Sequence, residues 1–261
     1  MPAPDLWGSM KRVRGLAAGS ALVLAAAGGL CWSLGEIPQW MSGGTQMVPH
    51  PPLAAAFSGP SLTLAPGATI LVISDSNATS SRIGGAPNWP SRIGHMLGHG
   101  IAVRNMSRSG STVWAWQERY RVPAGADLCV IAFGSNDAAS RGWLGTRHPV
   151  GTARFADDIL RLIGACREHG TAQVLVLAPV PTGSPAMERR VAPYRTAARE
   201  AAIRARAQFA DPMEAFAGSQ AGRPYLSYDA LHLTARAHQR LAAWLASRIQ
   251  IRGKDAGRKA R

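Results

Sequence analysis

Residues 68–77 read Ala-Thr-Ile-Leu-Val-Ile-Ser-Asp-Ser-Asn, and this stretch decides the fold. Its first part, 68–73, is a short apolar run with β-branched residues, which is typical of a buried strand. The run ends in the turn-prone cluster Ser-Asp-Ser-Asn at 74–77. The stretch therefore predicts a buried strand whose carboxyl end carries polar side chains.

Strands and helices alternate along the rest of the chain. Further strands are predicted at 101–105, 127–133, 173–180 and 208–212. Helices are predicted at 89–97, at 151–169 (capped by Thr152 and stopped by Gly170) and at about 193–206. A last helix is predicted to start after Thr234 and to present Leu241, Leu245 and Ile249 to the core. Because such alternation produces a parallel sheet covered on both faces, the chain is predicted to be an α/β protein. Chemistry in such sheets lies just past the carboxyl ends of the strands.

Length and composition favour a single globular catalytic domain. The chain has 261 residues, of which 46% are hydrophobic and 17% charged, and this excludes a wholly disordered chain. The formal charge of +14 comes mostly from scattered arginines. No nucleic-acid-binding motif accompanies them, so we interpret the charge as a basic surface and expect no nucleic-acid partner.

The three cysteines, Cys31, Cys129 and Cys166, form no C-x-x-C pair, so no zinc or thioredoxin-like site is predicted. Cys129 falls in a predicted buried strand and Cys166 on the apolar face of a predicted helix. Free buried thiols are the favoured interpretation. A Cys129–Cys166 disulfide in an oxidising compartment stays open as the alternative.

The N-terminus resembles an export signal. Lys11, Arg12 and Arg14 precede an uncharged, apolar stretch at 15–35. This stretch is nearly long enough to span a bilayer, so 1–35 is predicted to be either a cleaved signal peptide or an anchor in the inner membrane. In both cases the charges place the following residues outside the cytoplasm, in the periplasm or beyond. Residues 36–66 are predicted to be a Pro/Gly-rich linker and lead-in, 67–250 the catalytic domain, and 251–261 a basic tail.

Four polar segments follow predicted strands or precede the last helix, and together they supply the parts of a serine hydrolase. A serine hydroxyl, here Ser76, needs a base to take its proton. His232 can act as that base, and Asp229, three residues earlier, can hold its ring. The developing oxyanion needs donors. The backbone N–H of Ser76, the N–H of Gly110 and the side-chain amide of Asn136 are predicted to provide them.

These segments resemble the blocks of the SGNH (GDSL-like) hydrolases, named after their Ser, Gly, Asn and His. Ser76 and Gly110 match the first two blocks, Asn136 stands in a G-x-N-D sequence, and Asp229 and His232 match the D-x-x-H of the last block. Trp89-Pro90, Thr234 and His238 also resemble family features. The resemblance covers about 68–249 in the correct order. It implies a three-layer α/β/α sandwich with a five-stranded parallel sheet, of flavodoxin-like type, and no metal or organic cofactor.

One residue departs from the family pattern. The first block usually reads Gly-Asp-Ser, and Ser74 here replaces the Gly. An added Cβ at a tight turn would cost about 1 kcal/mol if φ were positive.

The predicted function is an exported serine esterase that acts on acyl esters through an acyl-enzyme. The sequence Ser-Asn-Ala-Thr at 76–79 resembles the carbohydrate-active members of the family, which favours O-acetyl groups on an envelope or secreted polysaccharide such as cellulose. A lipase- or thioesterase-type acyl hydrolase, or an O-acyltransferase, would use the same triad. A non-catalytic glycan-binding protein on a retired hydrolase fold is the alternative from another class.

Overall fold

The computed structural model describes residues 45–53, 61–80, 83–139, 148–217 and 224–252. These residues belong to one compact unit, which spans Gly43–Arg261. Among them, no helix combines the length and the apolar character that a bilayer crossing requires. The predicted leader at 1–35 and nearly all of the basic tail lie outside the described residues.

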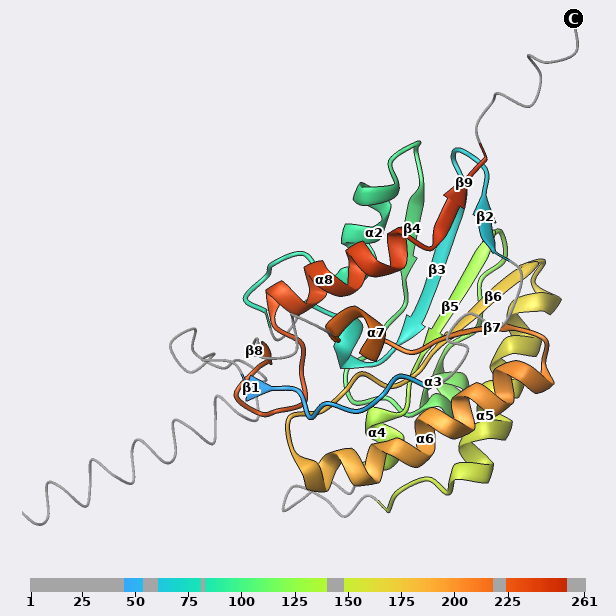
Figure 1. The fold of residues 1–261 in the computed structure, drawn as a ribbon. Coiled ribbons are helices and arrows are strands. Elements are labelled where there is room, and N and C mark those ends of the chain that lie inside the picture. Colours follow the sequence, from blue (N-terminus) through green and yellow to red (C-terminus); the bar gives the residue numbers. More distant parts are fainter. Residues whose placement is uncertain (1–44, 54–60, 81–82, 140–147, 218–223, 253–261) are drawn as a thin grey trace, which may run out of the picture. The chain divides into compact units, whose positions relative to one another are not determined.

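A five-stranded parallel sheet forms the centre of the domain (Figure 1). Its strands stand in the order β4 (Ala102–Asn105), β3 (Thr69–Ser74), β5 (Leu128–Ala132), β6 (Gln173–Leu177) and β7 (Gln208–Ala210). The chain therefore winds outward in both directions from β3. Such a reversal opens a crevice at the carboxyl edge of a doubly wound sheet, where ligands bind.

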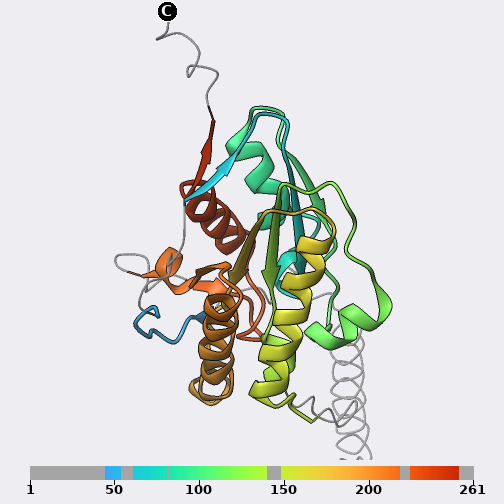
Figure 2. The same ribbon diagram turned by 90° about the vertical axis from the view of Figure 1, so that its right-hand side faces the viewer.

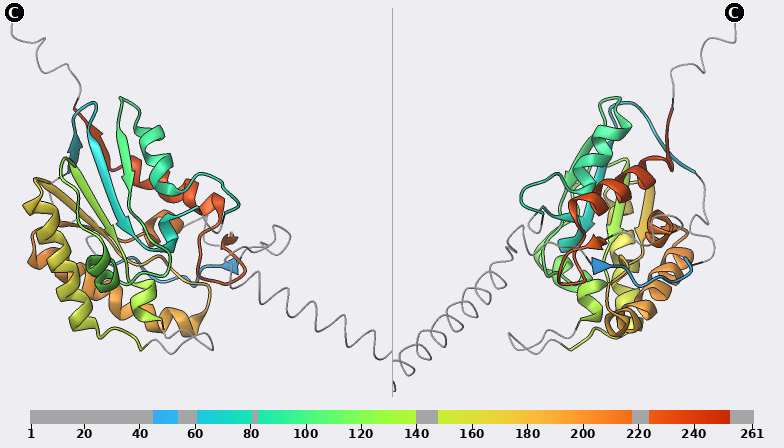
Figure 3. Two further views of the ribbon diagram at one scale, coloured as in Figure 1. Left: turned by 180° about the vertical axis from the view of Figure 1, so that it is seen from behind. Right: turned by 60° about the vertical axis from the view of Figure 1, so that its left-hand side comes forward.

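Helices cover both faces of the sheet, which explains why β3 is an unbroken apolar run. Ile70 and Val72 point into one core, and Leu71 and Ile73 into the other. The first core is covered by α2 (Trp89–Leu97) and α8 (Ala235–Ala246), and the second by α3 (Val113–Arg119), α5 (Thr152–Glu168) and α6 (Pro185–Arg204). Figure 3 shows α2 and α8 opposite α5 and α6, and Figure 2 shows α5 and α6 side by side. The predicted α/β/α sandwich with five parallel strands is confirmed.

Most predicted elements lie where the sequence pattern puts them, and α2 has the predicted bounds. Helix α6 differs, because it begins at Pro185 rather than near Pro193, which lies inside the helix. Proline fits the first helical turn, so Pro185 is the better start, and packing of the buried face carries the helix through Pro193. Thr152 is the first helical residue and makes no cap, so its predicted role is wrong. Ile249 has left the last helix and begins strand β9 (Ile249–Ile251).

Two short strand pairs attach part of the predicted linker to the domain. Strand β1 (Thr45–Gln46) pairs antiparallel with β8 (Pro224–Leu226), and β2 (Leu62–Leu64) pairs parallel with β9. In the segment between β1 and β2, the Val48 N–H donates to Thr182 O at 2.8 Å. The described part of residues 36–66 thus packs on the α/β domain.

Cys129 on β5 and Cys166 on α5 form a disulfide, with their Cα atoms 6.4 Å apart. It joins the central strand of the sheet to the helix that covers it. The favoured interpretation of free thiols is wrong, because the strand and the helix face turn both side chains into the same core.

Candidate active site

The turn at 75–79, called the nucleophile turn because it carries the predicted nucleophile Ser76, follows directly from the end of β3. Asp75 caps a short 3-10 helix, η2 (Ser76–Ala78), by accepting the Asn77 N–H at 2.9 Å. Thr79 donates both its N–H and its hydroxyl to the carbonyl of Ser76, at 3.2 and 3.0 Å. The turn is thereby held with Ser76 at the carboxyl edge of the sheet.

Ser74 fits this turn without backbone strain. It is the last residue of β3, pairs with Ala132 of β5 and has no positive φ. Its hydroxyl donates to the Ala132 carbonyl at 2.6 Å. The cost that a positive φ would bring therefore does not arise, and the departure from Gly-Asp-Ser adds a hydrogen bond between neighbouring strands.

Ser76, His232 and Asp229 form one hydrogen-bonded chain. His232 Nε2 lies 2.9 Å from Ser76 Oγ, and His232 Nδ1 lies 2.6 Å from Asp229 Oδ2. With Nδ1 donating to the carboxylate, Nε2 is left to accept the serine proton. Asp229 and His232 lie in the loop between β8 and α8, and His232 follows Ser76 by 156 positions in the sequence.

Asp229 is fixed as a carboxylate within its loop. Its Oδ1 accepts the Ser227 hydroxyl at 2.5 Å and the N–H groups of Leu231 and His232 at 3.1 and 3.0 Å. Burial raises the pKa of Asp229, but the hydrogen bond and charge of His232, together with the Ser227 hydroxyl, outweigh it and hold the pKa well below the usual range. A permanently ionised Asp229 suits a group that stabilises an imidazolium.

The loop between β8 and α8, called the histidine loop because it carries His232, adopts an unusual backbone conformation at Ala230, whose φ is +58°. Alanine rarely takes this conformation, so neighbouring contacts must hold it. The Ala230 carbonyl accepts the Gly183 N–H at 2.7 Å, and Ala230 N–H donates to Ser227 O at 2.9 Å. A Cβ at Gly183 would come within 2.9 Å of the Ala230 Cβ, so a glycine is required there.

A buried ion pair fixes the loop that carries Gly183. Arg195 of α6 donates to the carbonyls of Pro179 and Val180, both at 3.1 Å, and pairs with Glu188. Burial would raise the pKa of Glu188, but Arg195 and Thr182 lower it overall. Hydrogen bonds thus connect the loop after β6 to α6 through Arg195 and to the histidine loop through Gly183.

Asn136 reaches the nucleophile turn through Asp75. It lies in α4 (Ser135–Ala138), directly after β5, and its Nδ2 donates to Asp75 Oδ2 at 3.2 Å. The same amide carries a second hydrogen, which is the donor predicted for an oxyanion. Burial raises the pKa of Asp75 to about 6, against the smaller lowering effects of Asn77, His232 and Asn136. Sequence reasoning gave Asp75 no role, although its place directly before the nucleophile was a usable signal.

Gly110 lies in the loop after β4, at the same edge of the sheet. The Ser111 N–H donates to Arg108 O at 3.2 Å, and Gly110 has φ +75° at the third position of that turn. Glycine is the residue that adopts this conformation without strain. Arg108 N–H donates to Ser74 O at 2.9 Å, which holds the loop beside the nucleophile strand.

His238 is connected to the nucleophile turn through Trp89. Its Nδ1 accepts the Trp89 N–H at 3.1 Å, and the Trp89 indole donates to Asn77 O at 3.0 Å. Burial lowers the pKa of His238 to about 3, with smaller contributions from the charges of Arg92 and His232. A neutral His238 is what this acceptor role requires. The family resemblance pointed to His238 and Trp89, but only the fold shows what they contact.

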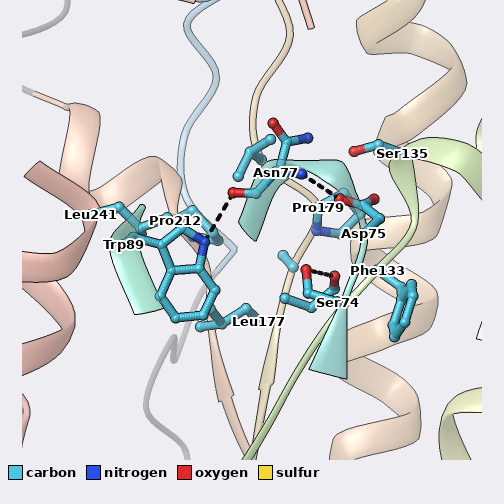
Figure 4. A pocket seen from close by; sticks show the side chains of 13 residues that line it. Ser74, Asp75, Asn77, Trp89, Phe133, Ser135, Leu177, Pro179, Pro212 and Leu241 are labelled. Atoms are coloured by element: carbon cyan, nitrogen blue, oxygen red, sulfur yellow. Dashed lines mark hydrogen bonds between the residues drawn. The ribbon is translucent and has the colours of Figure 1, made fainter. Parts of the chain in front are cut away.

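A small cavity lies next to the nucleophile turn (Figure 4). Its lining includes Ser74, Asp75, Asn77, Trp89 and Leu177, but not Ser76 or His232. The cavity has room for about one water molecule and is too small for an acyl group. Across the part of the chain that the structure describes, no three His, Cys, Asp or Glu side chains are grouped to hold a metal ion.

Comparison with known proteins agrees with this arrangement. The model of the GDSL-like Lipase/Acylhydrolase family matches residues 59–240. No curated protein matches the chain significantly.

Solved structures share the fold at low identity. A catalytic mutant of Axe2, an acetylxylan esterase from Geobacillus stearothermophilus, has a TM-score of 0.61 at 18% identity and covers 73% of this chain and 99% of its own. LAE5, an α/β hydrolase from the metagenome of Lake Arreo, Spain, has a TM-score of 0.57 at 20% identity, with 70% and 96% covered. A G-D-S-L family protein from Desulfitobacterium hafniense DCB-2 has a TM-score of 0.53 at 14% identity, with 69% and 98% covered.

Proposed function

The chain belongs to the GDSL-like lipase/acylhydrolase family and is a serine ester hydrolase, and from that premise we propose that it removes acetyl groups from a carbohydrate outside the cytoplasm. The hydrogen-bonded chain of Ser76, His232 and Asp229 carries the proposal, because it is the arrangement that activates a serine hydroxyl.

In the proposed mechanism, Ser76 Oγ attacks the ester carbon while His232 Nε2 takes the serine proton. The oxyanion is stabilised by the N–H groups of Ser76 and Gly110 and by the second hydrogen of the Asn136 amide. The tetrahedral intermediate then collapses, the bond to the alcohol breaks, and His232 returns the proton to that alcohol. Water repeats the sequence on the acyl-enzyme with His232 as base, which releases the acid and restores Ser76.

Two observations favour an acetylated carbohydrate as substrate. The structural neighbours include an acetylxylan esterase, and the Ser-Asn-Ala-Thr sequence at 76–79 resembles that of carbohydrate-active family members. Both are analogies at the level of fold and motif, so they select the substrate to test first. Acetylated xylan and acetylated cellulose are the appropriate pair.

Two other observations support export. Lys11, Arg12 and Arg14 precede the apolar stretch at 15–35, and the domain carries the Cys129–Cys166 disulfide. Disulfides persist mainly in oxidising compartments. Cell fractionation together with N-terminal sequencing of the mature protein distinguishes a secreted form, a periplasmic form and one retained in the inner membrane through 15–35.

A p-nitrophenyl ester panel, from acetate to long chain, tests the activity on wild type and on Ser76→Ala. We expect a preference for acetate and a loss of kcat of about 10⁴-fold or more in the variant. Release of acetate from the acetylated glycans supports the proposed substrate, whereas cleavage of long acyl esters alone would replace it with a lipase- or thioesterase-type activity. Transfer of acetyl to an added glycan would indicate an O-acyltransferase. Failure of Ser76 to react with a fluorophosphonate probe would favour a non-catalytic glycan-binding protein.

A further inference from the structure

Asn77, the residue after the nucleophile, connects three separate parts of the active site. Its N–H donates to Asp75 Oδ1 at 2.9 Å and its carbonyl accepts the Trp89 indole N–H at 3.0 Å, as Figure 4 shows. Its side-chain Oδ1 accepts the N–H of Leu233 at 3.3 Å. The residue is only 6% exposed, so these contacts are shielded from water.

The contact with Leu233 is the one that matters for chemistry. Leu233 directly follows His232, and Asn77 directly follows Ser76. The Asn77–Leu233 hydrogen bond thus runs parallel to the Ser76–His232 contact and joins the same two loops one residue further along each chain. Two adjacent links restrict rotation of one loop against the other, which a single contact does not.

This link depends on the asparagine side chain at position 77. The fourth letter of the GDSL name stands for leucine, and residue 77 here is asparagine. A leucine side chain accepts no hydrogen bond. It would leave the N–H of Leu233, a residue only 1% exposed, without this acceptor. Buried donors without partners are unfavourable, so the histidine loop would shift to find another acceptor.

We infer that Asn77 is a positioning residue that holds His232 Nε2 within proton-transfer distance of Ser76 Oγ, an inference that rests on the proposed roles of those two residues. The side chain acts on alignment and does not contact the reacting atoms. Misplacement of a reacting group by about 1 Å can cost 10²-fold in rate, so a smaller shift of the loop gives a measurable loss.

Asn77→Leu is the primary test, because the two side chains have a similar size and branching. We expect kcat for p-nitrophenyl acetate to fall about tenfold or more, with KM within about threefold of wild type, since alignment affects the transition state more than binding. The rate constant for labelling of Ser76 by a fluorophosphonate should fall by a similar factor. All rates are measured well below the Tm of each variant.

Asn88→Leu is the matched control. Asn88 caps α2 by accepting the Ser91 N–H at 3.0 Å, and its amide donates to the Ser80 hydroxyl at 3.0 Å, but none of its contacts involves the histidine loop. It should lower Tm without lowering kcat. Equal losses of kcat in both variants would mean that Asn77 is only structural.

Asn77→Ala also removes the acceptor of the Leu233 N–H, and it serves if the leucine variant does not fold; we expect a similar loss of kcat. A wild-type kcat in a folded Asn77→Leu or Asn77→Ala protein would overturn the inference. Ser76→Ala separates the two levels: if it stays active, the proposed function fails, and if only Asn77→Leu stays active, the inference alone fails.

Discussion

Replacing Gly134 by alanine should damage both the stability and the activity of this enzyme. Gly134 precedes α4, which carries Asn136, and its φ is +128°. A Cβ at this position would lie 2.4 Å from Cγ and 3.3 Å from Cβ of Pro179, in the loop after β6. Two separate costs therefore act at one residue: a backbone conformation that suits only glycine, and an overlap with a rigid ring.

The magnitude follows from these two costs. A non-glycine residue at positive φ costs about 1–2 kcal/mol. Forcing an extra methyl group into a packed site costs roughly 1–3 kcal/mol. We therefore expect Gly134→Ala to lose about 2–5 kcal/mol of unfolding free energy, or roughly 5–15 °C in Tm for a domain of this size. Displacement of Asn136 should also lower kcat about ten- to a hundredfold, since full removal of one oxyanion donor costs about 10²–10³.

Thermal and urea unfolding, together with kcat for p-nitrophenyl acetate, check this expectation. Gly125→Ala is the matched control, because Gly125 has φ +84° and no heavy atom within 4 Å of its added Cβ. It carries the backbone cost without the overlap, so it should lose only about 1–2 kcal/mol and keep its kcat. If Gly134→Ala proved as stable and as active as Gly125→Ala, the contact with Pro179 would not constrain the site and the reasoning would be refuted.

Two further predictions concern buried groups. Asp75→Asn should place an amide opposite the Asn136 amide and lower kcat about tenfold or more. It should also stabilise the protein above pH 6. Burial raises the pKa of Asp75 to about 6, so the stability that the protonated carboxyl contributes is full below about pH 3.8 and is lost as the pH rises through about 6. The loss is about 3 kcal/mol of unfolding free energy, and asparagine avoids it because its amide does not ionise. Urea unfolding of both proteins from pH 4 to 8 measures this, and parallel stability curves would contradict it. Removing the disulfide by Cys129→Ala together with Cys166→Ala should lower the unfolding free energy by about 4 kcal/mol, because the bond joins residues 37 positions apart. Alkylation of both cysteines in unreduced, denatured wild type would show that the bond is absent.

The sequence predicts the sheet and the order of the site residues because both depend on local signals. The apolar run at 68–73 and the turn-prone residues after it are visible without a structure, and the same holds for α2, which has Pro90 in its first turn. Parallel strands place their carboxyl ends at one edge, so polar residues after several strands are expected to meet.

The supporting contacts depend on tertiary packing, and no local signal encodes them. Nothing near Asp75 in the sequence indicates that its partner is Asn136, 61 positions later. Helix α6 continues through Pro193 because its buried face packs against the sheet, a contribution that outweighs the local preference against proline. Strand β1 is too short to give a sequence pattern, and it forms by pairing with β8, which precedes the histidine loop.

Two departures from local rules lie next to the residues of the proposed mechanism. Asp75 is a carboxylate only 2% exposed, and Ala230 adopts a backbone conformation that alanine avoids. Each lowers stability, and each lies beside a residue of the proposed mechanism: Asp75 orients Asn136, and Ala230 connects Asp229 to His232. A domain with about 5–15 kcal/mol of total stability can carry few such costs. His99 and Arg206 also have a positive φ elsewhere in the domain, so what distinguishes the site is the occurrence of both costs together. Unfavourable burial and strained backbone that both occur within the D-S and D-x-x-H segments therefore argue for an operating site rather than a retired one.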